Sequence, residues 1–273
     1  MAKAKLDEIT MHYQQKGEGP DVVLIHGLTG DLSPWYFTFI PALSQKYRVT
    51  AYDLRGHGLS DMPPSGYNSN IMAMDLKSLL DFLRIEKTFL VGHSYGGVIA
   101  MAFASKYPER VKGIIIYDTG FPALRRFRDM ESMLDWDKYE KILSQYNITR
   151  DTDFNDLKNT MELFLKVPLP FGLRKGRIRK NPRIRKLIQE TTAVKEFAET
   201  ADLTEERLLS VTHPVLAVYG SSSPVSEVGK HLEKNLAQCS LEYAEGEDHL
   251  FVLKEPKRFL RLVEDFLEEH TRS

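Results

Sequence analysis

Short apolar runs alternate along the chain with longer stretches in which apolar residues recur every three or four positions. Continuous apolar runs bounded by glycine or charged residues are typical of strands buried on both faces. We therefore predict strands at 21–25, 48–53, 88–91, 113–118, 214–220 and 240–244, preceded by a pair of short strands between 6 and 15. The helical period predicts helices at 35–47, 68–83, 98–104 and 257–270.

The order of these elements predicts an α/β fold. Buried strands separated by helices form a mostly parallel, twisted sheet with helices on both of its faces. From 121 to 210 the apolar strand runs stop and only helical patterns remain. We expect a core domain at 1–120 and 211–273, and a helical lid (cap) insert at 121–210 over the carboxyl edge of the sheet, where such folds bind ligands.

Composition narrows the class of protein further. The 273 residues are 42% hydrophobic and 27% charged with a formal net charge of −1, which is ordinary for a globular protein and gives no argument for nucleic acid. Cys239 is the single cysteine, so neither an intrachain disulfide nor a cysteine metal cluster can form. The first residues lack the apolar core of a signal peptide, and no apolar stretch is long enough to cross a bilayer. We expect a cytoplasmic protein.

Chemistry is indicated first by the segment 92–97, Gly-His-Ser-Tyr-Gly-Gly, between the strand at 88–91 and the helix at 98–104. A serine on a tight strand-to-helix turn is a nucleophile elbow. Gly92 and Gly96 leave room for the turn, and the strain exposes the Ser94 hydroxyl at the start of a helix. The amides at that end of the helix stabilise a nearby developing anion.

A serine needs a base to take its proton, and the base needs an orienting carboxylate. In elbow folds these groups follow the serine in the order acid, then histidine. Of eight histidines, His249 lies in a loop directly after the last predicted strand, and we predict that it is the base. His26 and His57 precede the nucleophile, and His93 is turned away beside it.

Four segments together resemble the α/β-hydrolase superfamily over nearly the whole chain. They are 26–27 (His-Gly), 53–58 (Asp-Leu-Arg-Gly-His-Gly), 92–97, and 246–249, which ends in His249. The resemblance implies an oxyanion hole formed by the backbone amides of Leu28 and Tyr95. It also implies that Asp53, Arg55 and His57 build a loop near the site.

The chain departs from the commonest pattern of that superfamily at the acid. The pattern places an aspartate three residues after Gly220, where this chain has Ser223. Asp118, at the end of the strand next to the elbow strand, and Glu227, further along the serine-rich loop, are the alternatives. We favour Asp118 because a sheet positions a strand-end residue more firmly than a loop positions a distal one. Capping of the following turn is the structural alternative for Asp118.

Several residues near these positions are candidates for contact with a substrate. They are His26, Trp35, Phe121 and Phe251. Core packing explains the aromatic residues equally well, because aromatic side chains bury large areas wherever they lie.

The predicted insert carries one marked excess of charge. Eight basic residues with no acid among them fall between 174 and 186: Arg174, Lys175, Arg177, Arg179, Lys180, Arg183, Arg185 and Lys186. A solvated helix face is one interpretation. The other is a docking surface for an anion, such as a phosphopantetheine-bearing carrier, coenzyme A or an acidic lipid surface. The preceding run 167–171, Val-Pro-Leu-Pro-Phe, would then be an apolar edge that suits an acyl chain.

These residues predict a serine hydrolase that cleaves a carboxylic ester, lactone or thioester through an acyl-enzyme, without a metal or organic cofactor. A C–C hydrolase or a perhydrolase could use the same groups. A low-turnover, receptor-like ligand-binding protein is the alternative from another class, and only the missing acid at Ser223 favours it.

Overall fold

The computed structural model describes residues 2–129, 136–154, 156–167, 181–249 and 251–271. Its centre is an eight-stranded sheet in the order β1-β2-β4-β3-β5-β6-β7-β8. The strands are β1 (Ala2–Lys5), β2 (Thr10–Lys16), β3 (Asp21–Ile25), β4 (Arg48–Tyr52), β5 (Thr88–His93), β6 (Val111–Tyr117), β7 (Val215–Gly220) and β8 (Cys239–Ala244). The β1–β2 and β2–β4 pairs are antiparallel, and every pair from β4 to β8 is parallel.

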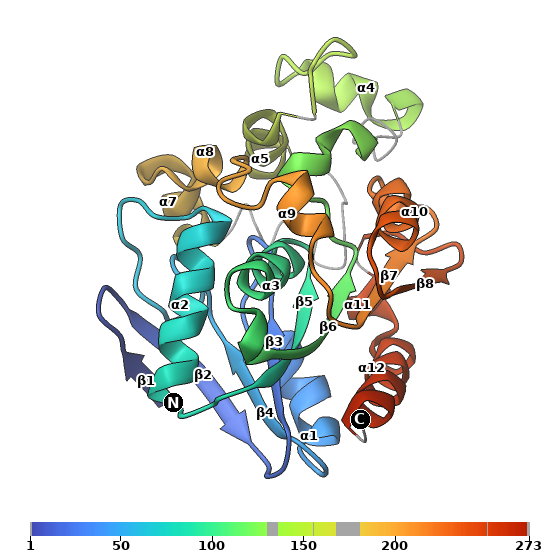
Figure 1. The fold of residues 1–273 in the computed structure, drawn as a ribbon. Coiled ribbons are helices and arrows are strands. Elements are labelled where there is room, and N and C mark those ends of the chain that lie inside the picture. The colour runs from blue at the N-terminus through green and yellow to red at the C-terminus, as the bar shows by residue number, and fades with distance from the viewer. Residues whose placement is uncertain (1, 130–135, 155, 168–180, 250, 272–273) are drawn as a thin grey trace.

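Helices cover both faces of the sheet (Figure 1). The α-helices are α1 (Ile40–Leu43), α2 (Ser69–Phe82), α3 (Tyr95–Lys106), α4 (Trp136–Ser144), α5 (Leu157–Lys166), α7 (Pro182–Glu190), α8 (Ala193–Phe197), α9 (Glu205–Leu209), α10 (Ser226–Asn235), α11 (Phe251–Lys254) and α12 (Pro256–Thr271). A π-helical turn, η1 (Trp35–Phe39), precedes α1, and two 3₁₀ turns, η2 (Pro108–Arg110) and η3 (Pro122–Phe127), flank β6.

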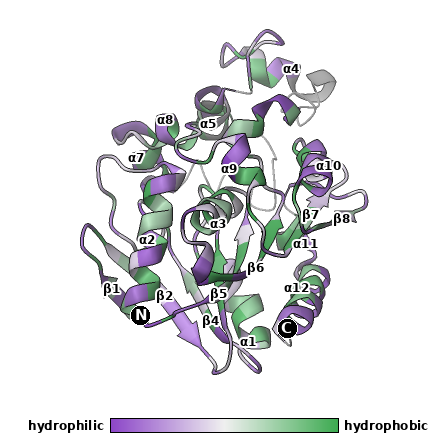
Figure 2. Cartoon of the chain, in the orientation of Figure 1, coloured by the Kyte–Doolittle hydropathy of each residue, from purple (hydrophilic) through white to green (hydrophobic). Residues whose placement is uncertain are grey.

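Two apolar clusters hold the layers together. The first joins one face of the sheet to α2, α3 and α10, and the second joins the other face to α1 and α12. In α2 the buried residues include Met72, Leu76 and Leu79, spaced three or four apart, and Asn68 caps the helix by accepting from the Ile71 amide. Helices α10 and α12 carry both colours in Figure 2, as helices with one buried and one exposed face do.

The predicted fold class is confirmed, and most predicted elements lie where expected. The strand at 21–25 and the capped helix after Asn68 begin and end within a residue of their predicted bounds. The opening strands differ: β1 ends at Lys5 and β2 begins at Thr10, so the turn between them occupies part of the range predicted as strand. Helix α10 was not predicted, because its sequence is mostly polar and offers few apolar positions.

The chain between β6 and β7 contains helices and, among its described residues, no strand. In Figure 1, α4, α5, α7 and α8 lie in the upper part of the view, and α9 lies beside α3. Leu187 of α7 and Phe197 of α8 belong to the main core cluster. Leu143, Phe154 and Leu163 instead belong to a small cluster of their own. The division into a core domain and a lid at 121–210 stays a prediction.

Within the described part of the chain, no helix combines the length and the apolar character needed to span a membrane.

Candidate active site

Ser94 lies between β5 and α3 in a strained backbone conformation. Its φ of 53° and ψ of −120° lie outside the regions that non-glycine residues ordinarily adopt. Its amide donates to the Tyr117 carbonyl at 2.8 Å, so the neighbouring strand β6 holds the turn in place. Strain maintained by surrounding contacts is typical of functional positions. This backbone is that of the predicted nucleophile elbow.

The elbow glycines are required by close approach of the backbone. A Cβ atom at Gly92 would collide with the carbonyl of Gly96, and one at Gly96 would collide with the carbonyl of Ile25. Neither obstacle can move without displacing a strand or the start of α3. The two glycines therefore allow the strand, the serine and the helix to pack at this distance.

Ser94, His249 and Asp118 form one hydrogen-bonded chain. His249 Nε2 lies 3.1 Å from Ser94 Oγ, and His249 Nδ1 lies 3.1 Å from Asp118 Oδ1. Because the carboxylate can only accept, Nδ1 carries the proton and Nε2 is free to accept from the serine. The register pairs His93 with Tyr117 on adjacent strands, which brings the next residues, Ser94 and Asp118, side by side at the sheet edge.

The turn at the end of β7 donates hydrogen bonds to both oxygens of the Asp118 carboxylate. Asp118 Oδ2 accepts from the Gly220 amide at 2.9 Å, and Ser223 Oγ donates to Oδ1. Asp118 is fully buried. Ser223, at the position where the commonest pattern has an aspartate, therefore bonds to the carboxylate that stands behind His249.

Glu227, the alternative acid, lies elsewhere. It is in the first turn of α10, where its exposed side chain pairs with Lys230 at 2.6 Å. Between the two candidates, the structure brings Asp118 and not Glu227 to His249.

His93 makes a contact that the sequence did not suggest. Its Nε2 lies 3.2 Å from the main-chain oxygen of His249, and a carbonyl only accepts, so His93 donates. Burial lowers the pKa of His93 to about 3, with the His249 ring as a smaller cause. The neutral ring thus keeps this donor across the ordinary pH range and fixes the loop that carries His249.

The two amides expected at an oxyanion hole belong to Tyr95, which follows Ser94, and to Leu28, whose turn packs against Ser94. Tyr95 is the first residue of α3, and the first amides of a helix have no acceptor within it. Leu28 is the second residue of a turn closed by the Gly30 amide and the Gly27 carbonyl. A Cβ atom on Gly27 would lie 2.9 Å from the Ser94 Cβ, so this turn packs directly against the serine.

The charged residues around 53–57 are structural, as expected. Asp53 accepts from the Leu32 and Leu59 amides at 2.8 Å each, and buried Arg55 pairs with Asp75 at 2.6 Å. His57 Nδ1 donates to the Arg55 carbonyl, and its Nε2 accepts from the Thr29 amide. Burial lowers the pKa of His57 to about 3, so a neutral ring supports the turn beside Ser94.

His26 has a comparable structural position. Its Nδ1 donates to the Gly27 carbonyl at 2.8 Å, and its Nε2 accepts from the Leu54 amide at 3.0 Å. Burial lowers the pKa of His26 from its usual value. Both ring nitrogens are therefore occupied by the protein, which favours a bracing role over contact with a substrate.

The aromatic candidates favour core packing. Trp35 and Phe251 belong to the cluster that includes α1 and α12, where Trp35 packs edge-on against Phe39 and Phe251 packs against Tyr117. Phe121 is fully buried in the cluster on the other face. The burial of these three side chains favours core packing, and their contact with a substrate stays a prediction.

The basic segment is described in part. Arg174, Lys175, Arg177, Arg179 and Lys180, and also 168–171 of the apolar run, lie outside the described residues. Arg183 bonds to the Ser60 carbonyl, which ties α7 to the sheet layer, and Lys186 lies 3.9 Å from Glu190. Arg185 instead lines a cavity of ≈ 730 Å³ between α5, α7 and α8, together with Lys158, Lys166 and Lys195.

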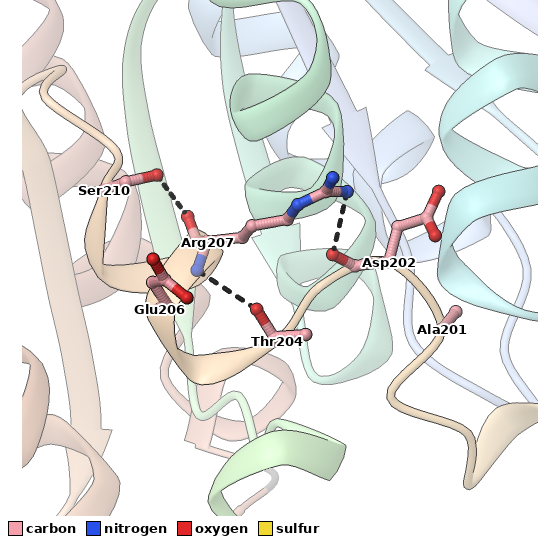
Figure 3. A pocket seen from close by; sticks show the side chains of 6 residues that line it. All are labelled: Ala201, Asp202, Thr204, Glu206, Arg207 and Ser210. Atoms are coloured by element: carbon pink, nitrogen blue, oxygen red, sulfur yellow. Dashed lines mark hydrogen bonds between the residues drawn. The ribbon is translucent and has the colours of Figure 1, made fainter.

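A hollow of ≈ 460 Å³ beside α9 is lined by polar residues that bond to one another (Figure 3). Thr204 caps α9 by accepting from the Arg207 amide, and the Arg207 side chain donates to the Asp202 carbonyl. Ser210 donates to the Arg207 carbonyl. These three bonds stabilise the ends of the short helix α9.

Relatives of the chain are hydrolases and related enzymes. A Bacillus subtilis (strain 168) protein, whose proposed activity is that of a 2-succinyl-6-hydroxy-2,4-cyclohexadiene-1-carboxylate synthase, is 27% identical over 94% of this chain and 95% of its own. A 2-(acetamidomethylene)succinate hydrolase of Mesorhizobium japonicum is 35% identical over 116 residues, which cover 42% of this chain and 41% of the relative.

Solved structures share the fold over nearly the full length. Est816, described as an N-acyl homoserine lactone degrading enzyme, matches with a TM-score of 0.69 and 25% identity, covering 97% of this chain and 100% of its own. The family model described as alpha/beta hydrolase fold matches residues 20–246, most of the chain. The chain therefore belongs to the alpha/beta hydrolase fold family.

Proposed function

We propose that the protein is a serine hydrolase that cleaves a carboxylic ester, lactone or thioester through an acyl-enzyme. The observation that carries the proposal is the hydrogen-bonded chain from Ser94 Oγ through His249 to Asp118, with 3.1 Å at each step. The lactone-degrading enzyme among the similar structures supports the substrate class.

The first half of the reaction forms the acyl-enzyme. Ser94 Oγ attacks the carbonyl carbon while its proton passes to His249 Nε2. Asp118 stabilises the imidazolium that results, and the amides of Leu28 and Tyr95 donate to the oxyanion. His249 then returns the proton to the leaving alcohol or thiol as the tetrahedral intermediate collapses. One preorganised oxyanion donor contributes on the order of 3 kcal/mol.

The second half releases the acid. A water molecule takes the place of the leaving group, and His249 Nε2 removes its proton as the oxygen attacks the acyl carbon. The second tetrahedral intermediate collapses with return of the proton to Ser94 Oγ. The proton on His249 Nδ1 stays on that nitrogen and remains hydrogen-bonded to Asp118 throughout, so the carboxylate orients the ring and does not itself accept or transfer a proton.

The Asp118 geometry also bears on the receptor-like alternative. That alternative depended on the missing aspartate at Ser223, and a buried carboxylate at Asp118 supplies what Ser223 lacks. A complete set of nucleophile, base and acid supports turnover over binding alone. C–C hydrolysis and perhydrolysis would use the same three groups, and a substrate panel distinguishes them.

The segment 121–210 is proposed as the lid that shapes the substrate pocket, and its charged cavity suggests what it recognises. The described lining residues include the cations Lys158, Arg185 and Lys195, and the one carboxylate among them is that of Asp156. Leu165 and Ile188 give the cavity an apolar part as well. A group that combines an anion with an acyl chain, as on an acyl carrier or coenzyme A, matches this lining.

Kinetics with matched substrates test the reaction class. The panel presents one acyl group as ester, lactone and thioester, with a β-diketone and a peracid-forming mixture added, to wild type and Ser94→Ala. We expect turnover of at least one acyl substrate, a mass increase equal to the acyl group after rapid acid quenching, and neither with Ser94→Ala. Absence of turnover and of adduct across the panel would favour the receptor-like alternative.

Salt dependence tests the charged cavity. A charged thioester should lose kcat/KM with rising salt, while a neutral ester of equal chain length does not. Arg185→Glu should lower kcat/KM for the thioester several-fold. Lys186→Glu, on the same helix but paired with Glu190, should leave it unchanged. Identical salt dependence for both substrates would refute the docking role.

A further inference from the structure

Ser223 lies where the loop after β7 reaches the acid of the site. Its side chain is buried, unlike those of Ser221 and Ser222, its exposed neighbours in the same turn. Its Oγ bonds to Asp118 Oδ1, the same oxygen that accepts from His249 Nδ1 at 3.1 Å. Ser223 and His249 therefore share one acceptor atom.

The direction of the Ser223 hydroxyl follows from its two neighbours. The Val225 amide donates to Ser223 Oγ at 3.3 Å, which occupies an acceptor position on the hydroxyl. Asp118 as a carboxylate only accepts, so the hydroxyl proton points at Oδ1. The serine is thus a donor directed at the acid by its own turn.

This bond restricts how the carboxylate can turn. With Gly220 on Oδ2 and Ser223 on Oδ1, donors from a single turn hold both oxygens. The turn is closed by the Ser223 amide on the Gly220 carbonyl, and the Ser222 amide bonds to the Glu247 carbonyl in the loop that carries His249. Rotation of the carboxylate away from His249 would break bonds to both loops.

We propose that Ser223 is a positioning residue that fixes the Asp118 carboxylate for His249. The inference rests on the proposed function, in which Asp118 is the acid.

A double-mutant cycle tests the positioning role. Ser223→Ala should lower kcat about 10-fold, the loss of one hydrogen bond to a charged group, with KM unchanged. In an Asp118→Asn background the same substitution should cause no further loss, because Ser223 acts only through the carboxylate. Ser223→Thr, which keeps the hydroxyl, should stay near wild type, as should Ser222→Ala at the exposed neighbour.

The outcomes distinguish failure of the Ser223 inference from failure of the acid assignment at Asp118. Equal losses from Ser223→Ala in both backgrounds would show a general structural role and overturn the inference. Wild-type activity of Ser223→Ala would also overturn it, provided that Asp118→Asn is impaired. Wild-type activity of Asp118→Asn would instead refute the acid assignment in the proposed function.

Discussion

The carboxyl edge of the sheet, which carries Ser94, and the outer helices of the 121–210 segment, α4 and α5, are held in different ways. At the edge, main-chain bonds between strands fix the residues: the Ser94 amide bonds to the Tyr117 carbonyl, and the Asp118 amide bonds to that of Val218. In the outer helices, a small apolar cluster that includes Leu143 and Leu163 supplies the packing among the described residues. One region is positioned by backbone and the other by a few side chains.

From this difference we expect the sheet edge to carry the catalytic groups and the outer helices to select the substrate. Backbone register changes little when surface side chains are substituted, so groups placed by it can be held to the accuracy that proton transfer requires. A helix positioned by a small cluster tolerates substitution and can acquire new contacts. We expect substitutions at the sheet edge to act on kcat, and substitutions in the outer helices to act on KM and substrate choice.

The largest effect is expected at the nucleophile. Ser94→Ala should lower ester turnover by about 10⁵-fold or more, as removal of the nucleophile does in other serine hydrolases. Ligand binding should persist, because the substitution leaves the pocket intact. Steady-state kinetics and calorimetric titration with a product acid measure the two. Residual turnover above one hundredth of wild type would mean that Ser94 is not the nucleophile.

The elbow glycine should show the next largest effect. Gly96→Ala places a Cβ atom against the Ile25 carbonyl, which belongs to a central strand, and should destabilise the fold by about 3 kcal/mol or more. Gly246→Ala is the matched control, since its φ is +74° but nothing lies within 4 Å of the added Cβ, and should cost about 1 kcal/mol. Urea unfolding compares the two, and equal costs would contradict the steric argument.

Truncation in the two regions should have different consequences. Ile115→Ala, in the fully buried centre of the sheet, should lower the global free energy of unfolding by about 3 kcal/mol. Leu163→Ala, in the small cluster, should leave global unfolding nearly unchanged and speed proteolysis within 121–210. If Leu163→Ala lowers global stability as much as Ile115→Ala, the two regions unfold together.

The smallest effect concerns pH. His57 and His93 have folded pKa values of about 3, whereas an unfolded histidine titrates near about 6.5. The stability that the two neutral rings contribute is therefore fully present above the unfolded pKa of about 6.5, and it is lost as the pH falls from about 6.5 towards the folded pKa of about 3. When the pH falls from 7 to 5.5, each histidine should lower the free energy of unfolding by about 1 kcal/mol. Urea titrations at the two pH values measure this loss. His57→Gln should reduce the dependence of the free energy of unfolding on pH by the equivalent of about one proton.

The elements that sequence predicted best are those with a local cause. The strand at 21–25 is a continuous apolar run in the middle of a parallel sheet, and the segment around Ser94 contains its own strand, turn and helix. The acid is harder to predict from sequence, because its position depends on β6 lying between β5 and β7. Chain order does not state which strands are neighbours, so Asp118 and Glu227 both stayed open.

Contacts between distant segments were beyond sequence-based prediction. His93 was expected to point away from the site, yet its ring bonds to the main chain of His249. In the sequence, Ser223 indicates only that the usual aspartate is missing. Its bond to Asp118 depends on the pairing of β6 with β7. Trp35 followed the Leu28 loop closely in sequence but points into the core on the opposite face from α3.

The rate at which a fluorophosphonate labels Ser94 tests the central claim most directly. Intact-mass measurements over time on wild type, Asp118→Asn and Glu227→Gln compare the two carboxylates under one reaction. If Asp118 stands behind His249, wild type and Glu227→Gln label at the same rate and Asp118→Asn labels about 10³- to 10⁴-fold more slowly. Equal labelling of wild type and Asp118→Asn, with slow labelling of Glu227→Gln, would contradict the account.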